Sequence, residues 1–283
     1  MIRKLYPGGK RKAFNITYDD GVLQDVRFVE LLNQYGLKGT FNLNSELMER
    51  EFSWVHPCGL EIKRLSGAAV RHLYDGHEIA SHTLTHPYMH DLSENEILHQ
   101  LGADRWNLEQ HFGREVKGFA VPFDYYSDLI AGCAKRLGFE YARMSEFTGG
   151  YTPGHDYYHW KAGFYHILPG LTEYADGFLH TDEELALCQI VGHSYDLDTE
   201  NLWETMGAIL RKISGDPDVW PATNLELVRY LKAMDRAAVS EDHVCNHSDR
   251  DLWFEVDGTV RMLCPGQTIY AKRSRAYFGH RIV

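Results

Sequence analysis

The stretch FNITYDDG, at residues 14–21, is an apolar run of strand-forming residues that ends in two adjacent carboxylates and a glycine. Residues 22–35 follow with apolar side chains at helical spacing, and Gly36 is a helix-stop signal. The segment GTFNLN, at residues 39–44, then has the composition of a second strand. This order predicts a β-α-β unit, in which a helix connects two parallel strands.

The same alternation continues along the chain. Ser93-x-x-Glu96 is a capping-box pattern that opens a helix through about His111, and Thr223-x-x-Glu226 opens the last predicted helix in the same way. The other predicted elements are strands at 77–83, 116–123, 139–144, 164–168, 185–193 and 218–223, and helices at 66–76, 127–138 and 202–215. About seven alternations of strand and helix predict a parallel α/β sheet covered by helices, either closed as a barrel or open and doubly wound.

The pattern changes after residue 237. Residues 251–271 are rich in strand formers around Asp257-Gly258, which is typical of a hairpin turn. We therefore expect two regions, an α/β barrel at 1–237 and a small β-rich extension with a tail at 238–283. The tail, KRSRAYFGHRIV, is basic, and we expect it to be solvated.

Composition narrows the class of protein. The chain has 283 residues, 44% of them hydrophobic, and a net charge of −11, which argues against a nucleic-acid partner because phosphates require a basic face. Its five cysteines include no C-x-x-C pair, and the amino terminus lacks a secretory pattern, so we expect reduced thiols in a cytoplasmic protein. No apolar run approaches the roughly 20 residues of a membrane span.

Three polar groups follow predicted strands, and the carboxyl ends of parallel strands meet at one edge of a sheet. Asp19 and Asp20 end the first strand, His82 and His86 come after the strand residues HEIAS at 77–81, and His193 ends the strand at 185–193. One carboxylate and two imidazoles supply three ligands and leave a fourth position open, as a catalytic zinc requires. The spacing therefore indicates a metal site.

Each piece alone has a simpler interpretation. Asp-Asp-Gly after a strand is typical of a turn, and two histidines four residues apart also occur in ordinary polar loops. Pro87 disfavours helical geometry at His86, so we expect the histidine pair on a loop. The combination of strand-end carboxylates with the histidine pair favours the metal site over these readings.

The motifs TYDDG, HTLTH and VPF and the late strand-end His193, in this order over residues 12–237, resemble those of NodB-type polysaccharide deacetylases, carbohydrate esterase family 4. The resemblance implies a distorted (β/α) barrel of about seven parallel strands. It also implies a hydrolase that removes acetyl groups from N- or O-acetylated carbohydrates with a divalent metal, zinc first, with cobalt, nickel or manganese as alternatives.

The resemblance assigns roles to residues. Asp19 becomes the general base, and Asp20, His82 and His86 become the metal ligands. His193, in Val-Gly-His, matches the family's leucine-x-histidine motif and becomes the general acid.

The third motif, at residues 120–124, departs from the family pattern. The backbone N–H of Phe123 becomes a donor to the oxyanion, as in the family. The arginine that usually orients the base is replaced by Ala120, and Asp124 is an unexpected acid that could contact substrate. For the family's tryptophan motif, Trp160 is the best-placed candidate, in the aromatic segment 151–166. That segment could line a sugar groove or cover the barrel.

Two other functions remain open. A NodB-like hydrolase could cleave another C–N bond, in a cyclic amide or ureido compound, and the missing arginine keeps this possibility in view. The chain could also be an inactive barrel that only binds glycans. The presence together of Asp19, Asp20, His82, His86 and His193 favours an enzyme over the inactive barrel.

Overall fold

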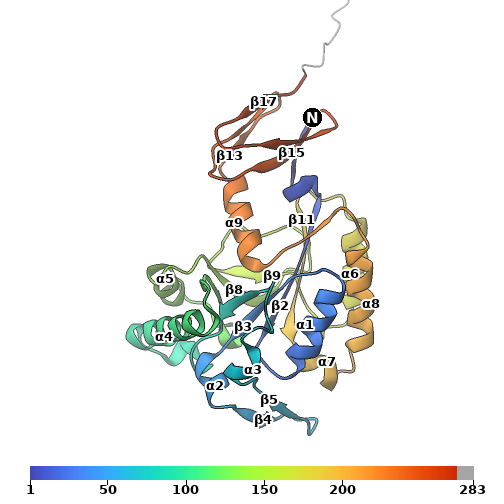
Figure 1. Ribbon diagram of the computed structural model, residues 1–283. Helices are drawn as coiled ribbons and strands as arrows, with labels where there is room; N and C mark the ends of the chain where they lie inside the picture. The colour runs from blue at the N-terminus through green and yellow to red at the C-terminus, as the bar shows by residue number, and fades with distance from the viewer. Residues whose placement is uncertain (273–283) are drawn as a thin grey trace, which may run out of the picture.

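The computed structural model describes residues 1–272, without the side chains of Ala68, Ala69 and Ser145. The basic tail expected to be solvated lies outside the described residues from position 273 on. A nine-stranded parallel sheet forms the body of the molecule, with helices around it (Figure 1). The predicted α/β barrel architecture is therefore confirmed.

The sheet runs in the order β10-β11-β2-β3-β6-β7-β8-β9, and β12 also pairs with β2. All of its strand pairs are parallel. Its strands are β2 (Lys12–Asp19), β3 (Gly39–Leu43), β6 (Glu78–Ser81), β7 (Gly118–Ala120), β8 (Tyr141–Phe147), β9 (Trp160–Ala162), β10 (Phe164–Tyr165), β11 (Ala186–His193) and β12 (Val219–Pro221).

One short segment closes the sheet. β9 pairs with β8, and β10, one residue later, pairs with β11 at the other edge of the sheet. Gly163 joins them, and a Cβ atom there would lie 2.3 Å from the Tyr174 hydroxyl and 2.7 Å from the Gln189 carbonyl oxygen. A residue without a side chain therefore permits the closure.

The nine strands occupy fewer positions than their number suggests. β9 and β10 are two halves of one segment, so they add one position around the barrel. β12 lies beside the first half of β2, at residues 12–14, and β3 lies beside the second half, at residues 16–19. The nine strands therefore fill about seven positions around the barrel, which agrees with the expected number of strands.

Helices cover the outer face of the sheet, except α9 (Asn224–Met234), which lies at the amino end of the barrel. The other long ones are α1 (Gln24–Gln34), α4 (Glu94–Phe112), α5 (Asp128–Arg136), α6 (Leu171–His180) and α8 (Trp203–Ser214). Both capping boxes form: Ser93 N donates to Glu96 at 2.8 Å, and Thr223 N donates to Glu226 at 2.9 Å. These two predicted helix starts are confirmed.

Several short elements join the long ones. They are α2 (Ser45–Glu49), α3 (Gly67–Val70), α7 (Asp196–Thr199), the 3-10 turns η1 (Pro7–Gly9), η2 (Met89–Asp91) and η3 (Pro122–Asp124), and the hairpin of β4 (Ser53–Val55) and β5 (Glu61–Lys63). The prediction of a helix over residues 66–76 was wrong in its length. Only α3 is helical, because turn hydrogen bonds such as Leu73 N to Val70 O follow it.

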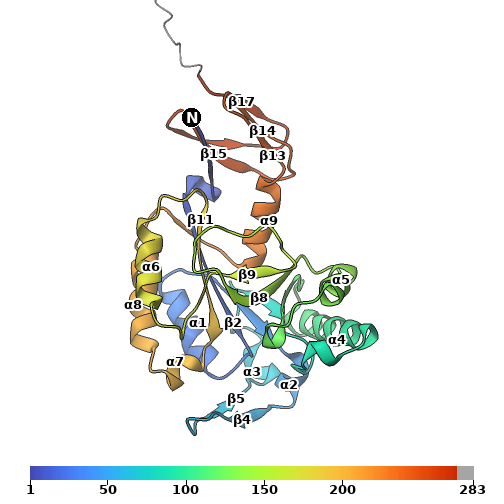
Figure 2. The same ribbon diagram turned by 180° about the vertical axis from the view of Figure 1, so that it is seen from behind.

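Two small antiparallel sheets lie at the amino end of the barrel, beside α9 (Figure 2). The strands are β1 (Ile2–Leu5), β15 (Leu252–Val256) and β16 (Thr259–Leu263) in one sheet, and β13 (Ala237–Val239), β14 (His243–Asn246) and β17 (Thr268–Tyr270) in the other. The predicted hairpin turn is confirmed, with positive φ at Asp257 and Gly258. Because β1 pairs with β15, this region includes the first strand of the chain; the division at residue 237 stays a prediction.

A buried apolar core lies between the sheet and the helices that pack on it. A second apolar cluster lies between α9 and the small sheets. Among residues 1–272, no helix combines the length and the apolar character needed to cross a membrane.

Candidate metal centre and catalytic pocket

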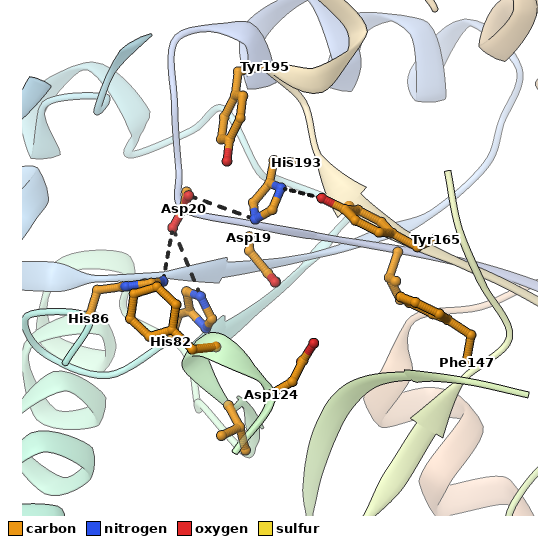
Figure 3. A pocket seen from close by; sticks show the side chains of 13 residues that line it. Asp19, Asp20, His82, His86, Asp124, Phe147, Tyr165, His193 and Tyr195 are labelled. Atoms are coloured by element: carbon orange, nitrogen blue, oxygen red, sulfur yellow. Dashed lines mark hydrogen bonds and ion pairs between the residues drawn. The ribbon is translucent and has the colours of Figure 1, made fainter. Parts of the chain in front are cut away.

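A cavity of about 260 Å³ opens at the carboxyl ends of the strands (Figure 3). The chain brings residues from β2, the loop after β6, η3 and the end of β11 to this one place. The predicted site residues that line it are Asp19, Asp20, His82, His86, Phe123, Asp124 and His193. Seven of the eight residues proposed from the sequence therefore surround a single cavity.

Asp20, His82 and His86 point toward one another across this cavity. The Asp20 Oδ1 atom lies 3.9 Å from His82 Nε2 and 3.7 Å from His86 Nε2. Ligands at ~2.1 Å around a tetrahedral ion stand about 3.4 Å apart. The three atoms therefore fit a single divalent ion with small adjustments.

A backbone hydrogen bond orients the His82 ring as a metal ligand requires. His82 Nδ1 lies 2.8 Å from the carbonyl oxygen of Ala120, which fixes the proton on Nδ1 and leaves the Nε2 lone pair toward Asp20. Burial lowers the pKa of His82 to about 4. The ring is thus neutral at pH 7, as a metal ligand must be.

His86 lies on the loop after β6, as the following Pro87 predicts. Its backbone has a φ of 55°, and its N–H donates to the Thr83 hydroxyl at 3.1 Å. Burial lowers the pKa of His86 as well. The loop therefore holds a second neutral imidazole against Asp20.

Arg64 contacts the same Asp20 oxygen as the two histidines, and no sequence motif indicated this arginine. Its Nη2 lies 3.0 Å from Asp20 Oδ1, and its Nη1 donates to the Asp20 carbonyl and to Asn44 Oδ1. Asn44 in turn donates to the carbonyls of His82 and Thr83. This network ties the two ligand-bearing loops together. Burial opposes ionisation of Asp20, but Arg64 and the nearby imidazoles together outweigh it, so the pKa of Asp20 lies below its usual range.

Asp19 has different partners from its neighbour. Its Oδ1 accepts from Asn42 Nδ2 at 2.7 Å and from Arg143 Nη2. Burial alone would raise the pKa of Asp19, but the Arg143 guanidinium together with the nearby His82 and His193 outweighs that effect and lowers the pKa. Asp19 is therefore an ionised carboxylate that points into the cavity beside the candidate metal site.

Asp196, the first residue of α7, orients His193. His193 Nδ1 lies 3.0 Å from Asp196 Oδ2, and the Nε2 atom on the other side of the ring lies 4.0 Å from Asp20 Oδ2. Burial would lower the pKa of His193, but the hydrogen bond to Asp196 and the nearby carboxylates raise it to about 9. His193 is thus a protonated donor at neutral pH.

The same Asp196 oxygen accepts several hydrogen bonds. His166 Nε2 lies 3.0 Å from it and the Tyr165 hydroxyl lies 3.2 Å from it. Gly192 makes room for this arrangement, because a Cβ atom there would lie 2.3 Å from His166 Nε2. An acid three residues after a strand-end histidine was a signal in the sequence that we did not use.

Backbone strain concentrates at this end of the barrel. Nine described residues other than glycine have a positive φ, and five of them lie at the cavity or in its loops: Asp20, Thr83, His86, Phe123 and Asp124. Residues persist in this region of conformational space only where the surrounding structure requires it. These five residues with positive φ therefore lie in the same loops as the sequence motifs that predicted the site.

Aromatic rings form the rim of the cavity. Phe123 stacks on Tyr88 with ring centroids 4.0 Å apart, and both side chains are about half exposed. Across the cavity, exposed Phe147 stacks on Tyr165 at 5.6 Å. Tyr195 stacks on His193 at 4.8 Å.

Trp160 is not brought to this cavity. It is 1% exposed and packs against Tyr141 in the apolar cluster near α9. Of the aromatic segment 151–166, Tyr165 lines the cavity, whereas His155 forms an ion pair with Asp235 away from it. One segment therefore serves both the core and the pocket.

The fold and the cluster together define a class: α/β barrels with an Asp-His-His metal site at the carboxyl ends of their strands. Residues 7–142 match a family model described as polysaccharide deacetylase. Over these residues, just under half of the chain, the sequence is similar to polysaccharide deacetylases.

Two relatives share the matching part of the chain. The chitooligosaccharide deacetylase of Azorhizobium caulinodans is 26% identical over 131 residues, which cover 45% of this chain and 56% of the relative. The peptidoglycan-N-acetylglucosamine deacetylase of Bacillus cereus is 25% identical over 131 residues, 46% of this chain and 54% of the relative. The match therefore spans little more than half the length of each.

The fold extends further than the sequence match. A solved structure of a candidate polysaccharide deacetylase from Mycobacterium smegmatis superposes with a TM-score of 0.62 at 15% identity, over 82% of this chain and 94% of the other. At this identity the likeness demonstrates a common fold and nothing finer.

Proposed function

We propose that this chain is a metal-dependent hydrolase that removes acetyl groups from N-acetylated carbohydrates. The observation that carries the proposal is that one ionised carboxylate, Asp19, and one protonated imidazole, His193, lie beside the Asp-His-His cluster in the same cavity. The names of the two relatives, a chitooligosaccharide deacetylase and a peptidoglycan-N-acetylglucosamine deacetylase, favour an N-acetylated sugar over an acetyl ester.

Asp20, His82 and His86 would hold the metal. A divalent ion there supplies a Lewis acid that polarises an acetyl carbonyl and lowers the pKa of water toward ~7. Two neutral imidazoles and one carboxylate with an open position suit zinc, with cobalt, nickel or manganese as alternatives.

Asp19 is the proposed general base. Its carboxylate faces the cavity next to the ligand cluster and remains ionised because of Arg143. It accepts the proton of the attacking water as the new C–O bond forms. The role requires a carboxylate that is not itself a metal ligand, and its separate partners, Asn42 and Arg143, keep it apart from Asp20.

His193 is the proposed general acid. It carries a proton at neutral pH, and Asp196 holds its Nδ1 so that Nε2 faces the cavity. When the tetrahedral intermediate collapses, His193 donates a proton to the departing sugar nitrogen. The backbone N–H of Phe123 is the proposed hydrogen-bond donor to the developing oxyanion.

The aromatic rim supports a carbohydrate substrate. Sugar rings present apolar C–H faces that pack on aromatic side chains, and the Tyr88–Phe123 and Phe147–Tyr165 pairs flank the cavity with exposed rings. Asp124 is the proposed polar contact to substrate hydroxyls, since it lines the same cavity. No contact with substrate is proposed for the buried Trp160.

The test compares purified protein before and after chelation on N-acetylglucosamine oligomers, an acetylated xylan and a cyclic amide, with released acetate or ring opening as the readout. We expect acetate release from the N-acetylated oligomers, loss on chelation and recovery with zinc or cobalt. Ring opening alone would support the cyclic-amide hydrolase, and binding of glycan without turnover would support the inactive barrel.

The Asp19→Asn variant is the control for mechanism. We expect it to retain one metal ion per chain and to lose about 10²–10⁴-fold in turnover, because a general base contributes that much. An Asp19→Asn variant with full turnover would contradict the assignment of the base.

A further inference from the structure

Ala120 and Arg143 are partners in adjacent strands. β7 and β8 are parallel, with Ala120 in register with Arg143, and Val121 N donates to the Arg143 carbonyl at 3.0 Å. Register partners in neighbouring strands project to the same face of a sheet, about 4.8 Å apart. A long side chain at position 143 can therefore reach the region that a side chain at position 120 would reach.

Arg143 does reach that region. The residue is 0% exposed, and its Nη2 donates to Asp19 Oδ1 from 124 residues away in the sequence. Ala120 is also fully buried, and its carbonyl accepts from His82 Nδ1. The small side chain at 120 leaves space beside β7, and the guanidinium that contacts the base comes from β8.

The hydrogen bonds set the orientation of the base. Asn42 Nδ2 and Arg143 Nη2 both donate to Asp19 Oδ1, so the carboxylate is held by one oxygen. Asp19 itself lines the cavity, so these two donors hold the base at the cavity wall. A planar guanidinium defines this orientation better than a point charge would.

We propose that Arg143 is the positioning residue for Asp19, and that it replaces from β8 the arginine that the family pattern places at position 120. The inference rests on the proposed function, because it assigns how the base of that reaction is held. It also explains how the chain can have alanine at position 120, where the family pattern has arginine, and still catalyse the same class of reaction.

The activity test is a double-mutant cycle between Arg143→Met and Asp19→Asn, measured on N-acetylglucosamine oligomers. A misplaced base costs about 10- to 100-fold in rate, so we expect Arg143→Met to lower kcat by that factor with KM and metal content unchanged. In the Asp19→Asn background we expect Arg143→Met to cause no further loss, because its effect passes through Asp19. An equal loss in both backgrounds, or no loss in either, would overturn the proposal.

Two additions keep the test decisive. Arg105→Met removes a partly buried arginine outside the cavity, which pairs with Glu109 on α4, and we expect it to leave kcat unchanged. If Arg143→Met does not fold, Arg143→Lys enters the same cycle, with the same pattern expected.

A structural readout separates this inference from the proposed function. In crystals of Arg143→Met, we expect the Asp19 carboxylate to turn away from its position while Asp20, His82 and His86 stay in place. If the wild-type protein releases no acetate, the proposed function fails, and a turned Asp19 still upholds the inference. An unmoved Asp19 overturns it.

Discussion

The two ends of the barrel both bury polar side chains, but they satisfy them differently. At the amino end, both carboxylate oxygens of Glu78 are occupied: Thr40 and Leu225 donate to one, and Tyr141 donates to the other, all within 2.9 Å. At the carboxyl end, the buried Asp20 Oδ1 accepts no hydrogen bond and faces the Arg64 guanidinium and the two imidazoles.

This difference between the two ends indicates that the amino end contributes to stability and the carboxyl end to function. At the amino end the Glu78 carboxylate is satisfied within the protein, since the backbone N–H of Leu225, at the N-terminus of α9, is among its donors. The carboxyl end aims a carboxylate and two imidazoles at one point and strains the backbone to do so. Substitutions at the carboxyl end should therefore change activity, and substitutions at the amino end should change stability.

The largest effect is expected from removal of a ligand. His86→Ala should lose the bound metal and reduce turnover by on the order of 10³-fold or more, since a Lewis acid supplies several kcal/mol of transition-state stabilisation. Metal analysis of the purified protein and initial rates measure both losses. His99→Ala, an exposed histidine on α4, is the matched control and should keep metal and rate. A His86→Ala protein with full metal content would contradict the ligand set.

A smaller effect is expected at Asp196. His193 must be protonated to act as an acid, so activity should persist up to a pH of about 9 and fall above it. Asp196→Asn removes the partner that raises the pKa of His193, so the fall should move to lower pH, with about a tenfold loss at pH 8 and less at pH 6. A pH–rate profile measures the shift.

Asp198→Asn is the control for that profile. It removes an exposed acid from the same short helix, one that accepts from Trp203, and should leave the alkaline limb where it is. An Asp196→Asn profile that superposes on that of Asp198→Asn would count against His193 as the acid.

The aromatic rim should affect binding more than turnover. Phe147→Ala removes an exposed ring that stacks on Tyr165, and KM for oligosaccharides should rise about 2- to 13-fold with kcat unchanged, as the loss of an aromatic contact of about 0.5–1.5 kcal/mol predicts. Trp106→Ala, an exposed ring on α4, should leave KM unchanged. Equal KM values for the two variants would contradict a role for the aromatic rim in substrate binding.

The smallest effect on activity is expected at the amino end. Burial raises the pKa of Glu78 from 4.5 to about 7, so its share of stability is fully present below pH 4.5 and is lost as the pH rises through 7. Glu78→Gln should flatten the fall in Tm between pH 5 and 8 and leave kcat unchanged. A large loss of kcat in this variant would break the distinction between the two ends.

The sequence predicted the parts of the site that lie in local motifs. Asp19-Asp20 at a strand end, the two histidines on a loop before Pro87 and the strand-end His193 are each visible over a few residues, and the alternation of strands and helices predicts that they meet. The capping boxes at Ser93 and Thr223 fixed two helix starts for the same local reason.

The supporting residues were not predictable in this way. Arg143 and Arg64 meet their carboxylates across 124 and 44 residues of sequence, through strand register and a loop that no motif specifies. A charged residue within the apolar strand Tyr141–Met144 was the available signal for Arg143, because buried charges are rare unless they are paired. Trp160 shows the converse limit, since composition alone does not separate a ring in the core from a ring in a groove.

The most direct test of the account is anomalous diffraction from crystals grown with zinc. We predict a single strong peak within bonding distance of Asp20, His82 and His86, with Asp19 adjacent to the ion's open side but outside its coordination sphere. No peak at this position, or a peak coordinated by Asp19 in place of Asp20, would contradict the account.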